Sequence, residues 1–199
     1  DANTTGTGLV AIGMGSLGSN TTASSNTAAG YNSLANNTTG SQNSAFGNQA
    51  LEANTTASNN TACGFKALEA NTTGSKNTAI GHLSLGENTT GNFNTAVGFA
   101  SMDESTTASY SVAVGSGSLG NGSLSGGNNT CIGHNAGHNI TSGHSNTCVG
   151  TDAGDKIANG HSNTIIGEGS DVDHFQRVRA VVVGQDAGTI AQDNTFRAI

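Results

Sequence analysis

The chain has little of what an ordinary globular core is built from. Its 199 residues include no proline, no tryptophan, six phenylalanines and two tyrosines, against 30 glycines. This composition leaves too few large side chains for a conventional core. Polar chains of low complexity can be disordered, because they bury too little apolar surface to offset the entropy of ordering. Composition alone therefore leaves two classes open, a disordered chain and a repetitive fold.

Positive charge and long apolar runs are also scarce. Six Lys and Arg stand against 13 Asp and Glu, and the pair Arg177 and Arg179 is the densest basic stretch. We therefore expect no nucleic-acid partner, since phosphate binding needs clustered cations. No run approaches the roughly 18 apolar residues of a membrane span, so we expect no membrane insertion. Asp1 enters the repeat described below partway through a unit, which indicates a segment of a longer chain.

Cysteine is too rare and too irregular for a disulfide scaffold or a zinc site. The three cysteines are Cys63, Cys131 and Cys148. Cys131 and Cys148 occupy a repeat position that elsewhere holds alanine, and Cys63 lies one column on, beside Phe46 and Ile80, so we interpret all three as small buried residues. The alternative is a disulfide or a reactive thiol between Cys131 and Cys148.

The chain consists instead of one short unit repeated from end to end. The phrase Asn-Thr-Ala-apolar-Gly at Asn77 returns at Asn94, and its closing glycine recurs every 17 residues with one step of 18. A disordered chain has no reason to hold this phase, whereas a stack of identical coils requires it. We therefore expect structural roles for the glycines of this column, which are Gly13, Gly30, Gly47, Gly64, Gly81, Gly98, Gly115, Gly133, Gly150, Gly167 and Gly184.

Each unit predicts one rung of a solenoid. The stretch Thr-Ala-apolar-Gly reads as a short strand, and a second apolar position at Ala50-Leu51 and its equivalents predicts a second strand. Asn-Thr-Thr-Gly supplies turn residues. The fold class is therefore all-β, a parallel β-solenoid or β-roll of about eleven 17-residue rungs, roughly 50 Å long at the usual strand spacing. Stacking should also align the asparagines into side-chain hydrogen-bond ladders.

The repeat divides the chain into four regions. Residues 1–119 form a first sub-array with a leucine column, and residues 120–128 carry the one-residue phase slip. Residues 129–167 form a second sub-array, in which Gly137 and Gly154 replace leucine while Ile140 and Ile157 appear three places later. Residues 168–199 are a degraded repeat, which suggests a transition to a downstream module.

The repeats resemble those of trimeric surface fibres. SVAVGSGSLG (111–120) is similar to the head repeat of trimeric autotransporter adhesins. NTAVGFAS (94–101) and NTCIGHNAG (129–137) resemble repeats of phage tail fibres, neck appendages and giant-virus surface proteins, which often precede an endosialidase-type intramolecular chaperone. The resemblance implies a homotrimer, intertwined or side by side, in an extracellular, cell-surface or virion fibre. It also implies host attachment to cell-surface glycans or proteins; a pure spacer is the alternative.

No residue pattern indicates catalysis, and we expect neither an enzyme nor a cofactor. The glycine-rich strings lack the Lys-Ser/Thr of a phosphate loop. Glu52 and Glu69 share a column, as a glycosidase pair could, but solvated charges explain them more simply. His144 and His161 also share a column, in two copies of GHSNT. Stacked in a trimer they could hold a metal or an anion, although outward-facing turn residues are the simpler interpretation.

The threonines of Asn-Thr-Thr allow two further functional interpretations. A candidate exposed array consists of Thr22, Thr39, Thr56, Thr73 and Thr90. Such files resemble the surfaces of ice-binding β-solenoids, which makes ice binding the alternative function. Asn-Thr-Thr is also an N-glycosylation sequon, which has meaning only for a chain made in a eukaryotic secretory pathway.

Overall fold

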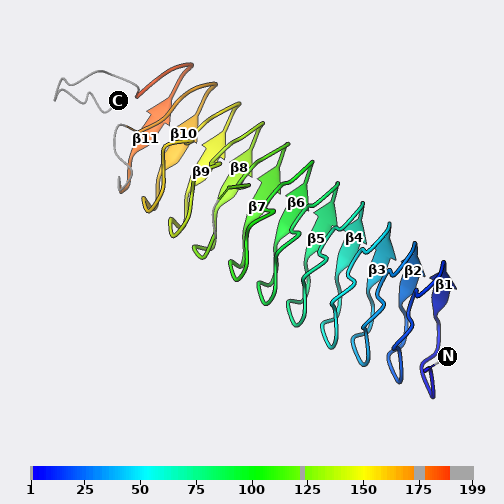
Figure 1. The fold of residues 1–199 in the computed structure, drawn as a ribbon. Helices are drawn as coiled ribbons and strands as arrows, with labels where there is room; N and C mark the ends of the chain where they lie inside the picture. Colours follow the sequence, from blue (N-terminus) through cyan, green and yellow to red (C-terminus); the bar gives the residue numbers. More distant parts are fainter. Residues whose placement is uncertain (1, 122–123, 173–177, 189–199) are drawn as a thin grey trace.

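The chain folds into a rod of stacked rungs, each contributing one short strand to a single parallel sheet (Figure 1). The structure is a computed structural model that describes residues 2–121, 124–172 and 178–188. The sheet follows chain order, and neighbouring strands pair in register, for example Thr78 with Thr95. The strands are β1 Val10–Ile12, β2 Thr27–Ala29, β3 Ser44–Phe46, β4 Thr61–Cys63, β5 Thr78–Ile80, β6 Thr95–Val97, β7 Val112–Val114, β8 Thr130–Ile132, β9 Thr147–Val149, β10 Thr164–Ile166 and β11 Val181–Val183.

This arrangement confirms the prediction of an all-β parallel solenoid, and the described residues contain no helix. The sheet also continues across the phase slip, since Ala113 of β7 pairs with Cys131 of β8. The extra residue is therefore accommodated outside the strands. Beyond it, β11 still pairs with β10. The predicted downstream transition falls largely on residues 173–177 and 189–199, outside the described residues.

The glycine that ends each strand is needed because the next rung passes very close. In Gly81 the backbone has φ +132°, which L side chains rarely adopt, and a Cβ there would overlap the carbonyl oxygen of Gly98. The same positive φ occurs in every glycine of the predicted structural column, from Gly13 at +116° to Gly30 at +148°. Only glycine reaches this conformation without steric cost.

The second half of each rung is not a strand, so the prediction of two strands per rung is wrong. In this half the chain makes turn bonds within the rung, such as Asn37 N–H to Leu34 C=O at 3.3 Å. Intervening N–H groups bond to the next rung, as in Leu34 N–H to Ala50 C=O at 3.0 Å. The leucine column adopts φ between +50° and +54°, which no strand residue does. These residues are Leu17, Leu34, Leu51, Leu68, Leu85, Met102 and Leu119.

Burial explains why leucine tolerates this backbone. A left-handed conformation costs an L-residue about 1 kcal/mol. Leu51 is fully buried, and burying a leucine side chain contributes about 2 kcal/mol. The core of the first sub-array pairs this column with a small strand residue. The small residues, all 0% exposed, are Ala28, Ala45, Ala62, Ala79, Ala96 and Ala113.

The core changes its construction after the slip. Cys131 and Cys148 replace the strand alanine, Gly137 and Gly154 replace leucine, and Ile140 and Ile157 point inward from three positions later. A Cβ on Gly154 would lie 2.5 Å from Cys148 Sγ and 3.3 Å from Ile157 Cδ1. The larger residues have therefore taken the space of the missing leucine, as the shift in the sequence pattern predicts.

Two asparagine ladders run along the rod and confirm the prediction of side-chain ladders. In the first ladder, Asn20, Asn37, Asn54, Asn71 and Asn88 each donate to the asparagine of the preceding rung at 2.8–3.2 Å. In the second ladder, illustrated by Asn43, the backbone N–H donates to Asn26 Oδ1 and the amide donates to Ala57 C=O. Both ladders are buried, so their bonds also satisfy polar groups that water does not reach.

The first ladder ends at Ser105, which is too short to continue it. Asn88 Oδ1 and Ser105 Oγ are buried and have no hydrogen-bond partner. We expect Ser105→Asn to supply the missing donor to Asn88 and to raise the free energy of unfolding by about 1 kcal/mol. Chemical denaturation measures this, with Thr107→Asn at the neighbouring exposed position as the control. An unchanged or lower stability in Ser105→Asn would contradict the ladder as a source of stability.

The exchanged core of the second sub-array predicts coupling between two positions. Gly154→Ala should destabilise the rod by about 3 kcal/mol, because its Cβ meets Cys148 Sγ and its φ of +68° is strained. Adding Cys148→Ala should restore about 1 kcal/mol, although Cys148→Ala alone leaves a cavity. A double-mutant cycle of unfolding free energies measures this coupling. Strict additivity would show that the two residues do not compete for the same space.

Candidate functional surface

The candidate surface is the outer side of the sheet, called here the strand face. In β2 to β11 the middle residue is buried in the core, while the first and third point outward, as Thr78 and Ile80 do around buried Ala79. The first positions form a column rich in threonine and the third positions an aliphatic column. The aliphatic column consists of Ile12, Ala29, Phe46, Cys63, Ile80, Val97, Val114, Ile132, Val149, Ile166 and Val183.

A third column, two residues beyond the aliphatic one, is mostly apolar or aromatic in the first half of the rod, with Asn48 as the exception. Phe65, His82 and Phe99 stack in series, with ring centroids 5.0 and 5.2 Å apart. Met14 and Tyr31 hold the same position in earlier rungs and are also exposed. In later rungs this column becomes polar, with Ser116, His134, Thr151, Glu168 and Gln185. The strand face therefore has an apolar half toward β1 and a more polar half toward β11.

Among the described residues, the negative charges of the first sub-array lie in the turn half of the rung. Glu52 accepts hydrogen bonds from Asn32 and Gln49, and Glu69 pairs with Lys66 at 3.0 Å. Each carboxylate thus has a partner of its own and is half-buried, and its role as a solvated charge or as one of a pair stays a prediction. The strand face itself carries no Asp, Glu, Lys or Arg from β1 to β10 in its threonine and aliphatic columns.

Comparison with known proteins returned no match: no family model, no curated protein and no solved structure resembles the chain closely enough. The chemistry of the strand face therefore has to be inferred from its geometry. Within the described ranges, no helix has the length and hydropathy needed to cross a bilayer.

The two predicted histidines do lie together. The rings of His144 and His161 stack with centroids 4.6 Å apart, and each Nδ1 lies 3.3 Å from the hydroxyl of the following serine. One chain thus offers two imidazoles in this column. In the part of the chain that the structure describes, no group of three or more His, Cys, Asp or Glu side chains is placed to hold a metal ion. A metal site at His144 and His161 stays a prediction that depends on other copies.

Two of the three cysteines have the buried packing role that the sequence predicts for all three; the prediction is wrong for Cys63, because the third residue of its strand points outward. Cys131 and Cys148 lie opposite each other in neighbouring strands, form no disulfide and are fully buried. The contact with Cys148, together with burial, raises the pKa of Cys131 well above its ordinary value, so this group remains a thiol. Cys63 differs from both because it is exposed in the aliphatic column of the strand face.

The Asn-Thr-Thr turns place only one threonine of each pair outward. Thr22, Thr39, Thr56, Thr73 and Thr90 are exposed. The threonine before each one is partly buried and uses its hydroxyl to bond the next rung, as Thr38 Oγ1 does with Thr55 C=O at 3.0 Å. These turns therefore present a single exposed file rather than two. The sequence interpretation missed the flatter threonine column on the strand face, which the alternation Thr-Ala-Val/Ile signals.

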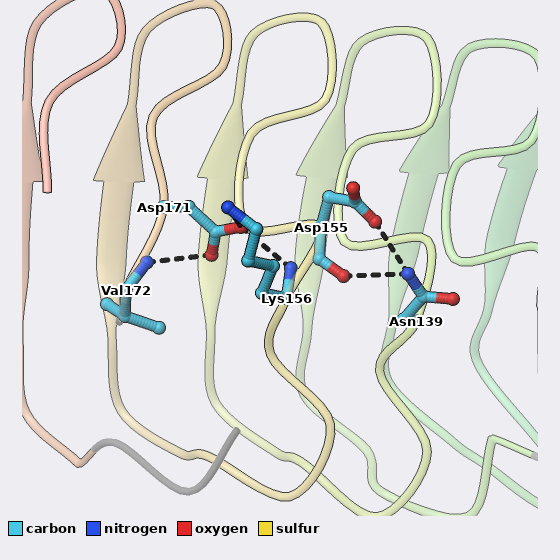
Figure 2. A network of polar contacts seen from close by, with 5 residues as sticks. All are labelled: Asn139, Asp155, Lys156, Asp171 and Val172. Atoms are coloured by element: carbon cyan, nitrogen blue, oxygen red, sulfur yellow. Dashed lines mark hydrogen bonds and ion pairs between the residues drawn. The ribbon is translucent and has the colours of Figure 1, made fainter. Parts of the chain in front are cut away.

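A polar network ties together the rungs of the second sub-array (Figure 2). Asn139 donates to the backbone carbonyl and the carboxylate of Asp155, and Asp171 accepts from the backbone N–H groups of Lys156 and Val172. Asp171 stands where the first sub-array has leucine. Burial raises the pKa of Asp171, while the two N–H groups and the ammonium of Lys156 at 3.9 Å oppose this rise. The network therefore links residues of three successive rungs.

Asp103, in the turn half of its rung, has a strongly raised pKa. The pKa of Asp103 is raised to about 6, first by burial and then by Glu87 and Glu104, while His82 acts in the opposite direction. The folded state therefore holds the Asp103 proton more tightly than the unfolded state. The stability that this gives is fully present below the unfolded pKa near 4 and is lost as the pH rises through 6.

Replacing this carboxyl should therefore change stability in a pH-dependent way. We expect Asp103→Asn to raise the free energy of unfolding by about 1 kcal/mol at pH 7.5, a value discounted for partial exposure, and to have no effect near pH 4. Urea denaturation at both pH values measures this, with Glu168→Gln as the exposed control. Equal effects of Asp103→Asn at the two pH values would show that Asp103 is not the titrating group.

Proposed function

We propose that the chain is a structural segment of a trimeric extracellular or virion surface fibre, which acts in host attachment by multivalent presentation and not in catalysis. The observation that carries this proposal is the strand face, an apolar surface that runs along a rigid rod. A rod of this kind holds its two ends a fixed distance apart, and copies of the rod can associate through an apolar face.

The extent of the strand face favours a protein partner over solvent. Between β2 and β10 its large apolar side chains are between 39% and 57% exposed, and exposed apolar surface of this kind marks interaction sites. The side chains concerned are Tyr31, Phe46, Phe65, Ile80, Phe99, Ile132 and Ile166.

A second copy of the same rod fits this surface best. Both partners then have the same rung spacing, so each column meets an equivalent column along the whole length. The chain has a formal net charge of −7, yet the threonine and aliphatic columns from β1 to β10 are uncharged, so copies meet there without facing carboxylates. A thin core with few large side chains also gains from burial between copies.

The two unlike halves of the strand face favour copies that run in the same direction. In a parallel arrangement, the aromatic half of one copy packs against the aromatic half of another. An antiparallel arrangement would place Met14 and Tyr31 near the polar end that carries Glu168 and Gln185. Parallel copies extend as a fibre with like ends together, which suits presentation of identical tips.

The number of copies and the role in attachment come from the resemblance to adhesin and tail-fibre repeats. Three parallel copies would multiply weak contacts to cell-surface glycans or proteins through avidity. A pure spacer would have the same rod and the same association without contacts of its own. Binding of the isolated segment to a glycan array separates these two functions, because an adhesive rod binds without its neighbours.

Assembly through the strand face predicts two results. Light scattering on the isolated segment should give the mass of three chains, and mild oxidation should link Cys63 of one copy to Cys63 of another. Cys63 is the exposed cysteine of the aliphatic column, whereas Cys131 and Cys148 are buried. Non-reducing electrophoresis measures the link. A clean monomer by light scattering would overturn the proposal.

Two variants serve as controls for the cross-link. Cys63→Ser should abolish it, and moving the thiol to an exposed turn with Cys63→Ser/Thr56→Cys should not restore it. In addition, Ile80→Glu should dissociate the copies without unfolding the rungs, since Ile80 points out of the solenoid core. Efficient cross-linking of the double variant, or an unchanged mass in Ile80→Glu, would move the interface away from the strand face.

A further inference from the structure

The Asn-Thr-Thr repeats are N-glycosylation sequons whose asparagines belong to the first ladder. A sequon consists of Asn, any residue except proline, and Ser or Thr. The ladder residues Asn20, Asn37, Asn54, Asn71 and Asn88 each begin such a sequon, and each is at most 1% exposed. The repeat therefore buries a modification signal in successive rungs.

Both hydrogens of each ladder amide are already used. Asn54 Nδ2 donates to Asn37 Oδ1 at 2.8 Å and to Ala57 C=O at 3.1 Å. Asn71 Nδ2 donates in the same way to Asn54 Oδ1 at 3.0 Å and to Gly74 C=O at 2.9 Å. Each amide thus joins two rungs and also closes its own turn.

Glycosylation is chemically incompatible with these bonds. In the transfer, Nδ2 forms a bond to the anomeric carbon of a lipid diphosphate-linked sugar, the lipid diphosphate leaves, and the amide loses one proton. One of the two donated hydrogens is then gone, and a bulky hydrophilic sugar takes its place. At a ladder position this sugar would stand in the core between two rungs, where the neighbouring asparagine needs the same space.

Three other sequons are placed differently. Asn36, Asn59 and Asn128 begin the sequons Asn36-Asn37-Thr38, Asn59-Asn60-Thr61 and Asn128-Asn129-Thr130, and all three are exposed. None of their side chains makes a hydrogen bond within the described part of the rod, so a sugar on Nδ2 displaces nothing. The sequons at Asn3, Asn121 and Asn139 are intermediate, since their amides are hydrogen-bonded but not buried.

We infer that the folded rod accepts N-linked glycans at Asn36, Asn59 and Asn128, and that a glycan on any ladder asparagine prevents its rung from forming. The exposed modification sites and the ladder asparagines therefore share the same sequon and differ only in whether the asparagine is buried. A chain with this ladder folds efficiently only where oligosaccharyltransferase does not reach it first, which places a physical constraint on the route by which the fibre is made.

The exposed threonines provide a matched variant. The third residue of each ladder sequon is Thr22, Thr39, Thr56, Thr73 or Thr90, all exposed. Replacing these five by alanine removes the ladder sequons and leaves the asparagines in place. The exposed sequons are unaffected, because the one at Asn36 uses Thr38 and the one at Asn59 uses Thr61.

The test is translation of the full chain, behind a secretion signal, with endoplasmic-reticulum microsomes. Folded protein is selected by resistance to thermolysin, and peptide N-glycosidase in ¹⁸O-water then marks each formerly glycosylated asparagine for mass spectrometry. We expect the resistant fraction to carry the mark at Asn36, Asn59 and Asn128 and at no ladder position. The five-threonine variant should yield severalfold more resistant protein than the wild type.

Translation without microsomes is the control, and there both chains should give equal amounts of resistant protein. This control separates glycan damage from any loss of folding caused by the threonine replacements. Resistant wild-type protein marked at Asn37, Asn54 or Asn71 would overturn the exclusion. A resistant fraction without any mark at Asn36, Asn59 and Asn128, or equal yields of the two chains with microsomes, would overturn it as well.

Discussion

The fold depends on one constraint, which is that every rung must meet the next one in the same register. Parallel pairing holds each strand residue opposite its equivalent, as Ala79 lies opposite Ala96. A residue type that suits one rung therefore suits all, because its neighbours above and below are copies of itself. Asparagine suits such a stack of identical residues especially well, since its amide carries both a donor and an acceptor and can bond to the equivalent asparagine on either side. The glycine column follows from the same closeness between rungs.

Much of this architecture could be predicted from the sequence, because rungs in register require a constant repeat length and the sequence shows that length. The 17-residue spacing gave the strands, the structural glycines and the asparagine ladders, and the shift from Leu119 to Ile140 indicated a changed core. The second strand was predicted wrongly because short apolar stretches such as Ala50-Leu51 look alike in a strand and in a turn. What distinguishes them is the left-handed backbone of Leu51, and leucine is among the residues least expected to adopt it. Tertiary burial there overrides the local preference.

The candidate surface was harder to predict than the fold. The stacking of His144 and His161 follows from their shared column, and the structure places them together. The predicted threonine array, however, lies in the Asn-Thr-Thr turns and not on the strand face. Which side of a three-residue strand points outward depends on whether Ala79 or its neighbours Thr78 and Ile80 fill the core. A composition rule that places isoleucine inside gives the opposite answer, since here the leucine column leaves room only for alanine.

This inversion links the core to the proposed association between copies. Because Leu85 occupies the interior from the turn side, the strand can contribute only a small residue inward, and its larger residues must face outward. The rod thus exposes aliphatic and aromatic side chains as a direct consequence of how its own core is filled. The aromatic column outside ends at Phe99, and Ser116 already takes its place in the rung of Leu119, before Cys131 and Cys148 replace the inward strand alanine. The outside of the rod therefore changes one rung before the inside does, and the strand face is divided into a more apolar half and a more polar half.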